Sequence, residues 1–491
     1  MTAKTNTDRN RWIALYVLCA GMLMIVLDVT VVNVALPSIQ DDLGFSQSSL
    51  AWVVNAYLIA FGGLLLLSGR FGDLLGRKSV LMAGLGVFTL ASLLCGVAWS
   101  QETLVAARFI QGVGGAMTSA VILGMIFTMF PEPREQAKAI GVYGFVASAG
   151  GSIGLLAGGV LTQSINYHWI FFVNVPIGII TALLAQRLVP RDEGIGIRQG
   201  ADVAGAVLIT ACLMLTVYTI VKPAAQDGWG SAQALGGLAV SLALLVAFIV
   251  RESRTSRPLV PLRIFRSRTL SGANLVQALT VAGMFGMFFL GSLYLQRVLG
   301  YDALQIGLAF LPGTLIMGTL SLRFAEPLMM RFGARRVLVP GLALVAVGLL
   351  LFARAPVDGS YLADVFPSQV IISIGIGISI APLIALAMAG AAPQDAGLAS
   401  GVVNTSAQIG GAIGLAVLAT VSASRTGDLV AGGHSAAAAL TSGYHLAFLI
   451  AAGLVAAAIA VTLLVLEPQQ QPGRHAAPAE PVGTQVCTEA A

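Results

Sequence analysis

Charged residues are scarce in this sequence. Asp, Glu, Lys and Arg together make up 10% of its 491 residues, and 57% of the residues are hydrophobic. Water-soluble domains carry about 25% charged residues. The shortage of charge therefore excludes a water-soluble protein and indicates one that is integral to a membrane.

Residues that bind metals or form disulfides are also few. The chain has four cysteines and four histidines, without a Cys-x-x-Cys spacing, and it has no G-x-x-x-x-G-K-[ST] segment. No long soluble domain interrupts the apolar runs. These absences argue against an enzyme and an ATP-driven pump, and we expect no metal and no cofactor. The net charge of +5 resides in short loops between apolar runs, so we expect no nucleic-acid partner.

The apolar residues are grouped into long runs. About 20 residues are needed for a helix to cross ~30 Å of hydrocarbon, and fourteen runs meet that length. They begin near Trp12, Ser49, Ser79, Thr103, Ala137, Trp169, Val203, Ala232, Thr269, Leu304, Val337, Val365, Gly397 and Tyr444. The sequence thus predicts an all-α integral membrane protein, and fourteen, an even number, places both chain ends on one side.

The distribution of Lys and Arg predicts which side that is. Under this assignment, 22 of these residues lie on the side of the N-terminus and four, namely Lys222, Arg297, Arg354 and Arg425, on the opposite side. Cytoplasmic loops carry the excess of Lys and Arg. We therefore expect a multi-pass protein of the cytoplasmic membrane, in contact with the lipid bilayer, with both termini in the cytoplasm.

The connections divide the fourteen spans into 6 + 2 + 6. We expect a six-helix bundle at 1–188, two extra helices with cytoplasmic linkers at 189–268, a second six-helix bundle at 269–466, and a disordered cytoplasmic tail at 467–491. Residues 70–73 (RFGD) resemble residues 323–326 (RFAE) in the corresponding loop of the second half. Repeated halves are typical of transporters whose substrate site lies between the halves near the midplane.

Asp28 and Arg108 are the two charged residues that fall deep inside apolar runs. Asp28 lies ~24 Å from the cytoplasmic face and Arg108 ~8 Å below the outer surface, so their depths in ~30 Å of hydrocarbon are similar. Buried charges of this kind mark ion or substrate pathways. A movement that changes their separation would change the proton affinity of Asp28, which makes Asp28 a candidate proton carrier and Arg108 its modulator. The alternatives are a static ion pair that locks two helices and an Asp28 that caps a helix end.

The loop between the second and third spans is rich in Gly and charge. It reads Gly69-Arg70-Phe71-Gly72-Asp73-Leu74-Leu75-Gly76-Arg77-Lys78. Glycines permit a tight turn, and Asp73 is placed to accept hydrogen bonds from a neighbouring helix N-terminus. The alternative is a plain turn with positive charge on the inner side.

This loop resembles the cytoplasmic gate motif of the major facilitator superfamily. Residues 27–37 (LDVTVVNVALP) resemble the first-span motif of its fourteen-span drug/proton antiporters, and residues 108–112 (RFIQG) resemble its fourth-span motif. Residues 169–178 (WIFFVNVPIG) and the segment 404–411 also fit that branch. The resemblance implies the superfamily fold with 14 helices, and a gate role for Gly69, Arg70, Asp73, Gly76, Arg77 and Lys78 as a latch of the outward-facing state.

The fifth span keeps the glycine spacing of the family's antiporter motif. Gly150, Gly154, Gly158 and Gly159 match it, whereas Leu155 stands where the family usually has proline. Small residues four apart let helix backbones approach closely. The glycines also fit a simpler role in helix packing, and the missing proline would remove a kink.

Polar and aromatic residues in several spans form the expected substrate pocket. They are Asn33, Asn55, Tyr57, Gln111, Tyr143, Asn274, Gln277, Phe285, Phe289, Asn404 and Gln408. An apolar cavity with a few polar groups suits amphipathic organic molecules. Interhelical hydrogen bonding and packing are the alternative roles for each of them.

Together these features predict a proton-coupled antiporter that exports hydrophobic or amphipathic drugs by alternating access. Its partners would be a drug-like small molecule and protons, the proton gradient would supply the energy, and the protein is expected to be a monomer. Two alternatives remain at this point. One is a proton-coupled symporter that imports a small metabolite, and the other is a membrane protein that transports nothing.

Overall fold

The computed structural model describes residues 2–130, 132–190, 192, 194, 196, 202–224, 228–255, 258–389 and 396–466. All regular secondary structure within these residues is helical. The tail expected to be disordered, 467–491, lies outside the described residues.

The helices follow one another through the chain with short connections. They are α1 (Thr2–Leu43), α2 (Ala51–Leu75), α3 (Arg77–Gly96), α4 (Gln101–Met129), α5 (Pro133–Ser164), α6 (Trp169–Phe172), α7 (Asn174–Leu188), α8 (Val203–Val221), α10 (Ala232–Arg254), η2 (Leu262–Arg266), α11 (Arg268–Arg297), α12 (Ala303–Arg323), α13 (Ala325–Phe332), α14 (Ala334–Phe352), η3 (Tyr361–Val365), α15 (Phe366–Ala389), α16 (Ala396–Ala431) and α17 (Ala436–Leu464).

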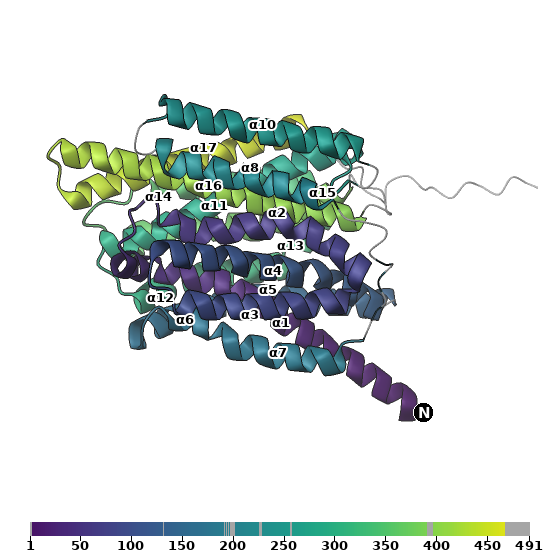
Figure 1. Cartoon of the computed structure of the whole chain (residues 1–491). Coiled ribbons are helices and arrows are strands. Elements are labelled where there is room, and N and C mark those ends of the chain that lie inside the picture. The colour runs from purple at the N-terminus through teal and green to yellow at the C-terminus, as the bar shows by residue number, and fades with distance from the viewer. Residues whose placement is uncertain are drawn as a thin grey trace, which may run out of the picture.

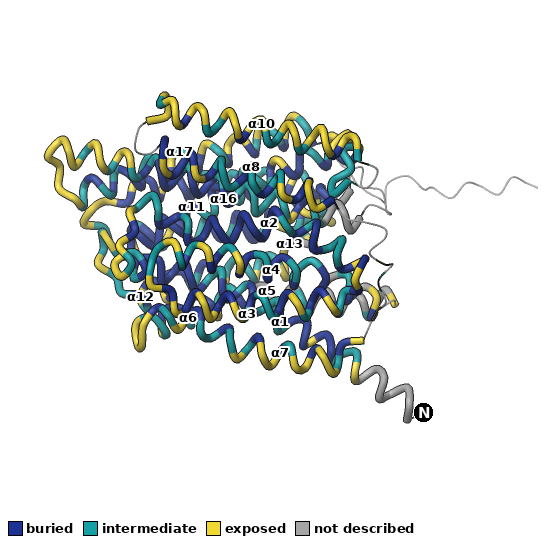
Figure 2. Tube along the Cα trace, viewed as in Figure 1, coloured by how far each residue is buried: buried dark blue, intermediate teal, exposed yellow. Residues whose placement is uncertain are grey.

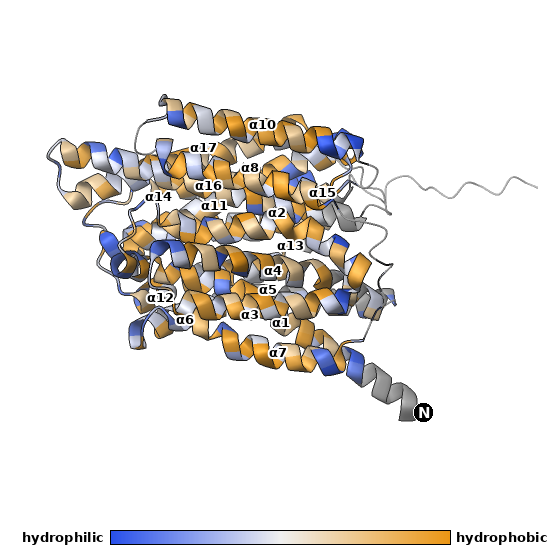
Figure 3. Cartoon of the chain, in the orientation of Figure 1, coloured by the Kyte–Doolittle hydropathy of each residue, from blue (hydrophilic) through white to orange (hydrophobic). Residues whose placement is uncertain are grey.

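The long helices lie side by side and are apolar along their middle portions (Figures 1 and 3). Among the described residues, 13 helical segments are long and apolar enough to cross a membrane. The helix α5, of 32 residues, occupies the position of the remaining predicted span. The prediction of an all-helical membrane protein is confirmed.

The first and last sets of helices repeat one packing pattern. The helix α1 packs on α5 as α11 packs on α16, and α3 packs on α4 as α14 packs on α15. The two sets meet where α5 lies against α12 and where α2 lies against α16.

The turn that precedes α3 recurs before α14. Gly76 has φ 89° and Gly333 has φ 86°, a backbone conformation that side chains rarely allow. Just after each turn a basic side chain bonds the end of its set's last helix. Lys78 Nζ donates to the carbonyl of Gln186 at 2.8 Å, and Arg335 Nη2 donates to that of Leu463 at 2.6 Å. The turns that follow residues 70–73 and 323–326 therefore repeat the same backbone conformation and the same kind of hydrogen bond.

The helices α8 and α10 form a hairpin beside the place where the two sets meet. The helix α8 contacts both α2 and α16, and Thr420 of α16 donates to the carbonyl of Ile220 at 3.3 Å. A side chain at Gly63 of α2 would collide with Thr210 of α8, 2.6 Å from its Oγ1. The helix α10 packs on α8 and exposes most of its length (Figure 2).

The two turn glycines form a matched pair for measuring strain. A Cβ at Gly333 would meet nothing within 4 Å, so Gly333→Ala should cost only the backbone strain, roughly 1–3 kcal/mol. A Cβ at Gly76 would lie 2.6 Å from the Asp192 carbonyl oxygen, so Gly76→Ala should lower the thermal unfolding midpoint further. Equal midpoints for the two purified variants would contradict this.

Candidate functional site

Asp28 and Arg108 meet inside the first set of helices. Asp28 lies on α1 and Arg108 on α4, with 0% and 1% of their surfaces exposed. Arg108 Nη1 is 2.6 Å from Asp28 Oδ2. The structure thus brings together the two residues that their depth in the apolar runs singled out.

The other oxygen of Asp28 also accepts hydrogen bonds. Gln111 Nε2 donates to Oδ1 at 2.7 Å, and Asn174 Nδ2 donates to the same atom at 2.9 Å. Every one of these partners is a donor, which is the environment of an ionised carboxylate.

The remaining groups of the network hold Arg108 and Gln111. Arg108 Nε donates to the Val53 carbonyl of α2 at 2.9 Å, and its guanidinium carbon lies 4.6 Å from the centre of the Tyr57 ring. Gln111 accepts from Arg108 Nη1 at 2.6 Å and donates to Ser92 Oγ of α3 at 2.8 Å. Five helices therefore contribute to one buried polar network.

Two members of this network, Asn174 and Ser92, are absent from the set predicted from the sequence. Asn174 lies in the segment 169–178 that resembles the drug antiporters, so a signal for it was present. Ser92 is one of many small polar residues in apolar runs, and nothing in its local sequence separates it from the others.

The gate loop is tied to neighbouring helix ends. Arg77 Nη1 donates to the Gly124 carbonyl of α4 at 3.0 Å, and Lys78 Nζ also donates to the Val189 carbonyl at 2.6 Å. Gly69 and Arg70 lie in the last turns of α2. These bonds fasten the start of α3 to the end of α4 and to the segment after α7.

Within the described residues, a helix N-terminus near this loop is capped by Asp192. Its two carboxylate oxygens accept from the backbone N–H groups of Arg77 at 2.7 Å and Lys78 at 3.0 Å, the first residues of α3. The sequence assigned such a capping role to Asp73. Asp73 Oδ1 instead lies 3.5 Å from Arg77 Nη2 in its own loop. Asp192 belongs to the polar linker after the sixth span, where sequence alone gives no sign of the contact.

The glycines of α5 face two different helices. Cβ atoms on Gly150 and Gly158 would meet α1, at 3.0 Å from Leu23 Cδ1 and 3.0 Å from the Val31 carbonyl oxygen, and one on Gly154 would overlap Thr30 of α1. A Cβ on Gly159 would lie 2.8 Å from Leu304 Cα of α12. The stripe therefore brings α5 against α1 within a turn of Asp28, and Gly159 brings it against the second set.

Leu155 is buried at this second contact. A Cβ on Gly307 of α12 would lie 2.5 Å from the Leu155 carbonyl oxygen. The position that usually holds proline in the family thus takes part in a close backbone approach between α5 and α12.

The two sets of helices also touch at the ends opposite to the N-terminus. Arg297 at the end of α11 pairs with Asp41 at the end of α1. Gln47 Nε2 donates to Ser422 Oγ of α16 at 3.2 Å. Together with the contact of Gly159, these interactions close that end of the molecule.

The expected pocket residues of the first set have separate surroundings. Tyr57 and Gln111 belong to the Asp28 network. Asn33 Nδ2 bonds the Val29 carbonyl of its own helix at 3.0 Å, and Tyr143 donates to Met22 Sδ at 3.3 Å. Asn55 is fully buried, and neither its Oδ1 nor its Nδ2 has a hydrogen-bond partner among the described residues.

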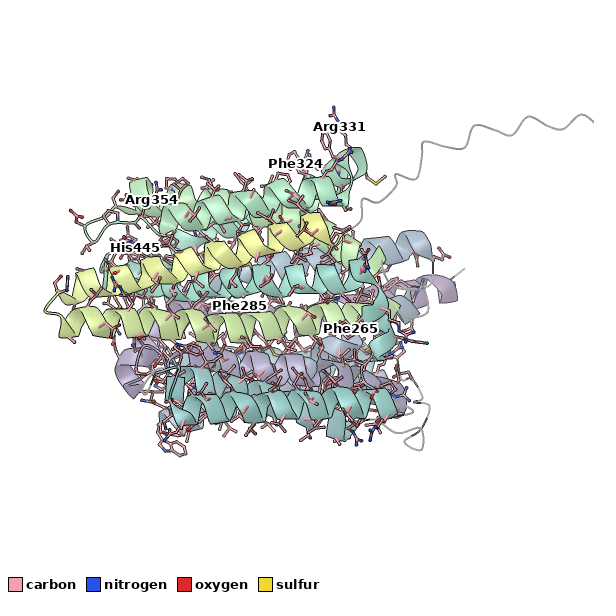
Figure 4. All side chains as sticks on the ribbon, turned by 90° about the horizontal axis from the view of Figure 1, so that it is seen from above. Phe265, Phe285, Phe324, Arg331, Arg354 and His445 are labelled. Carbon is pink, nitrogen blue, oxygen red and sulfur yellow. The ribbon has the colours of Figure 1, made fainter. Side chains whose placement is uncertain are left out.

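Four of the expected pocket residues in the second set lie on α11. Asn274 bonds the Leu270 carbonyl of its own helix at 2.8 Å, Phe289 is fully buried, and Gln277 is half-buried. Phe285 lies near α16, because a Cβ on Gly411 would be 3.1 Å from its ring (Figure 4).

The last two expected pocket residues lie on α16. Asn404 is exposed. Gln408 lies against α2, since a Cβ on Gly62 would be 2.7 Å from its Cβ. The grouping of the eleven expected residues around one substrate pocket stays a prediction.

A small recess, partly open to the outside and with room for about one water molecule, lies between α11, α12 and α15. Its lining includes none of the residues expected in the pocket: Met287, Phe288, Phe310, Gly313, Thr314, Met317, Gln369, Ile372, Ser373 and Ile376. Its volume falls short of the ~300–1,000 Å³ of drug-sized ligand sites. Thr314 also touches the first set, with its Oγ1 3.0 Å from Ser152 Oγ of α5.

Comparison with known proteins identifies the family. The sequence model of the Major Facilitator Superfamily matches residues 18–415. The chain belongs to this superfamily of membrane transporters. Membership confirms the resemblance and the predicted fold, and it agrees with the expectation that the chain is not an enzyme.

Individual relatives and structures agree with this assignment. The puromycin resistance protein pur8 of Streptomyces alboniger is 40% identical over 459 residues, covering 93% of this chain and 90% of the relative. The cephamycin export protein CmcT of Amycolatopsis lactamdurans is 41% identical over 428 residues, covering 87% of each. A bacterial homologue of the lysosomal transporter Spinster, solved inward-facing and unoccupied, shares the fold with TM-score 0.68 at 16% identity, covering 93% of this chain and 97% of that one.

Substitutions of Asp28 and Arg108 should have non-additive effects on the free energy of unfolding, because the two residues form an ion pair. Arg108→Gln leaves the carboxylate of Asp28 buried without its cation, so it should lower the free energy of unfolding by about 3–5 kcal/mol. Asp28→Asn in the same chain should restore much of that loss. Thermal unfolding of the single and double variants measures the coupling, and strictly additive effects would show that the pair does not interact.

Gly159 and Gly151 allow a matched test of the contact between α5 and α12. A Cβ on Gly159 would meet backbone at 2.8 Å, whereas one on Gly151 would meet nothing within 4 Å. Gly159→Val should therefore prevent closure at this end and strongly reduce the transport rate, while Gly151→Val should retain it at equal expression. Equal rates in the two variants would exclude a role for this contact.

Proposed function

We propose that this chain is a proton-coupled antiporter that exports hydrophobic or amphipathic antibiotics across the cytoplasmic membrane. Its relatives are named for puromycin resistance and for cephamycin export, and they align along most of its length. These names support an export direction and a drug-like organic substrate.

The observation that carries the proton coupling is the buried pair of Asp28 and Arg108. A charge deep in a membrane is costly unless it serves a pathway or is paired. Here the carboxylate accepts from Arg108, Gln111 and Asn174, so its ionised form is stabilised. A shift of any of these donors favours proton uptake, and their return favours release.

The arrangement of the helix ends supports one step of the cycle. The ends opposite to the N-terminus are closed by Arg297 with Asp41 and by Gly159 against α12. If both termini are cytoplasmic, as we propose, this is an inward-facing form that has already released its proton. In the outward-facing form, Asp28 binds a proton from outside as substrate leaves. It releases this proton to the cytoplasm when new substrate binds in the inward-facing form.

The distribution of basic side chains supports that orientation. Figure 4 shows Arg331 of α13 at the end of the helices opposite to Arg354 and His445. Arg77, Lys78, Arg331 and Arg335 belong to the side with many Lys and Arg residues, and Arg354 to the side with four. Excess positive charge marks the cytoplasmic side.

The proposed architecture is 6 + 2 + 6 in a monomer, with bundles at 1–188 and 269–466 and the extra pair at 189–268. The repeated packing of the two sets and the repeated turns at Gly76 and Gly333 support this division. In the same proposal the gate loop locks the cytoplasmic ends in the outward-facing form, when Asp73 exchanges Arg77 for a partner in the second bundle.

Energetically, one proton suffices for export of a neutral drug. A proton that enters down ~100 mV releases about 2.3 kcal/mol, and each unit of pH difference adds about 1.4 kcal/mol. Asp28 is the one carboxylate deep within an apolar run. We therefore infer a low proton stoichiometry and poor export of dications, which would need a second acid in the pathway.

We infer the substrate chemistry from the lining of the small recess on the second bundle, which has to widen before it admits a drug-sized molecule. Two Phe and two Met side chains provide apolar, polarisable surface, and Thr314, Gln369 and Ser373 provide a few hydrogen-bonding groups. Thr314 also contacts α5, so a substrate here would lie where the two bundles meet. This position supports coupling between substrate binding and the contact of α5 with α12.

The proposal is tested by Asp28→Asn in cells that express the transporter. The wild type should raise resistance to puromycin-like antibiotics and export fluorescent dyes, and a protonophore should abolish the export. Asp28→Asn should lose the uphill, protonophore-sensitive export. The conservative Glu102→Gln, an exposed acid at the start of α4, should behave as the wild type.

Two results would contradict the proposal. Normal uphill export by Asp28→Asn would remove the proton-carrier role. Lower resistance on expression, with uptake of the compounds, would indicate an importing symporter instead.

A further inference from the structure

A second pair of buried acids lies outside the Asp28 network, in the α8–α10 hairpin. Asp202 precedes α8, and Glu252 lies in the last turn of α10, with 4% and 3% of their surfaces exposed. Both are on the side of the N-terminus, at the base of the hairpin. Nothing in the proposed transport cycle uses them.

Each acid has one oxygen with a partner. Asp202 Oδ1 accepts from the backbone N–H of Gly205 at 2.9 Å and from Arg251 Nε at 2.7 Å. Glu252 Oε2 accepts from the backbone N–H of Val260 at 3.0 Å. These bonds join the start of α8, the end of α10 and the segment that leads to α11.

The other two oxygens are buried and converge on one point. Asp202 Oδ2 and Glu252 Oε1 have no hydrogen-bond partner among the described residues. A Cβ on Gly205 would lie 2.9 Å from the first and 2.7 Å from the second. Both oxygens therefore border the same small space beside Gly205. Two buried acceptors without a donor are unfavourable, so a positively charged or protic group between them would stabilise the pair.

The charge balance favours a proton. Within the part of the chain that the structure describes, the pair carries two negative charges and has one cationic partner, Arg251, so a single proton neutralises this set of charges. Calcium would require 6–8 oxygen ligands and magnesium near-octahedral coordination, whereas the site offers two unpartnered carboxylate oxygens. Close carboxylates that share one proton are a known arrangement, because both cannot ionise together at low cost.

Among the described residues, the surrounding elements add no further cation that contacts the pair. The helix α8 has no charged residue, and α16, which packs on it, has only Arg425 and Asp428 near its far end. The helix α2 contributes Arg70 and Asp73, which belong to the gate loop. Arg263 and Arg266 of η2 and Arg254 of α10 are exposed.

We propose that Asp202 and Glu252 share one proton across the face of Gly205, forming a carboxyl–carboxylate hydrogen bond that closes the base of the α8–α10 hairpin. This site is separate from Asp28 and does not depend on its role. Loss of the proton at alkaline pH leaves two facing anions, which opens the base of the hairpin. Since α8 contacts both α2 and α16, such opening alters the place where the two bundles meet.

Infrared difference spectroscopy of the protein in lipid nanodiscs detects the shared proton. The Asp28→Asn variant serves as background, because it removes the other deep carboxyl group. At neutral pH it should show the C=O stretch of a protonated carboxyl that shifts in D₂O and disappears at alkaline pH. The band should be lost in Asp28→Asn/Glu252→Gln and in Asp28→Asn/Asp202→Asn, and retained in the control Asp28→Asn/Glu102→Gln.

Thermal unfolding separates the hydrogen bond from packing alone. The amide of Glu252→Gln can donate to Asp202 Oδ2, so its midpoint at neutral pH should stay near that of the parent and should fall less as the pH rises. Glu252→Ala should have a lower midpoint. Equal midpoints for the Gln and Ala variants would exclude a donor at this position.

Two spectroscopic outcomes overturn the inference. The first is absence of a protonated carboxyl band at neutral pH in the Asp28→Asn background. The second is a carboxylate shift on addition of calcium or magnesium chloride that Glu252→Gln removes, because it would identify a metal cation as the occupant.

Discussion

The structure depends first on the high free-energy cost of an unpaired charge inside the hydrocarbon of the membrane. Arg108 cannot lose its charge in a protein, and 1% of its surface is exposed. Its position is therefore tolerable only with Asp28 and Gln111 beside it and with the Val53 carbonyl accepting from it. Because these groups belong to α1, α2 and α4, a single electrostatic requirement fixes how the helices of the first bundle are rotated. Because the hydrogen bonds that Asp28 accepts come from α4 and α7, they also tie α1 to both of these helices.

Much of this could be predicted from the sequence, for reasons that are specific to membranes. Length and hydropathy determine the spans because backbone groups in lipid must be satisfied within a helix. The similar depths of Asp28 and Arg108 in their spans were enough to predict that the two residues could pair. The rotation of each helix about its axis was not predictable from the sequence, so the contacts of the individual polar side chains were not predictable either. Asn33 and Asn274 turn to carbonyls of their own helices, and the observed recess is lined by residues such as Met287 that resemble ordinary core.

Contacts that depend on loops were also beyond the sequence. Asp192 caps α3 from a linker that lies more than a hundred residues further along the chain. Likewise, Asp202 and Glu252 come from opposite ends of the added hairpin, and each looks like a solvated loop residue in the sequence. The sequence repeat between the two halves was weak because different residue types make the same contact. Lys78 in one half and Arg335 in the other each donate to a carbonyl near the end of a helix. Both cations satisfy the final carbonyls of a helix, and this requirement does not distinguish between them.

The adjacent glycines Gly62 and Gly63 give the extra hairpin a further significance. One lets α2 press against Gln408 of α16, and the other lets it press against Thr210 of α8. Gly62 and Gly63 point in different directions. The backbone of α2 therefore lies directly against Gln408 on one side and against Thr210 on the other. A chain reduced to twelve spans by excision of α8 and α10 would bare the Gly63 flank as a narrow furrow open to acyl chains. The hairpin thus covers the Gly63 side of α2 next to the contact of α2 with α16.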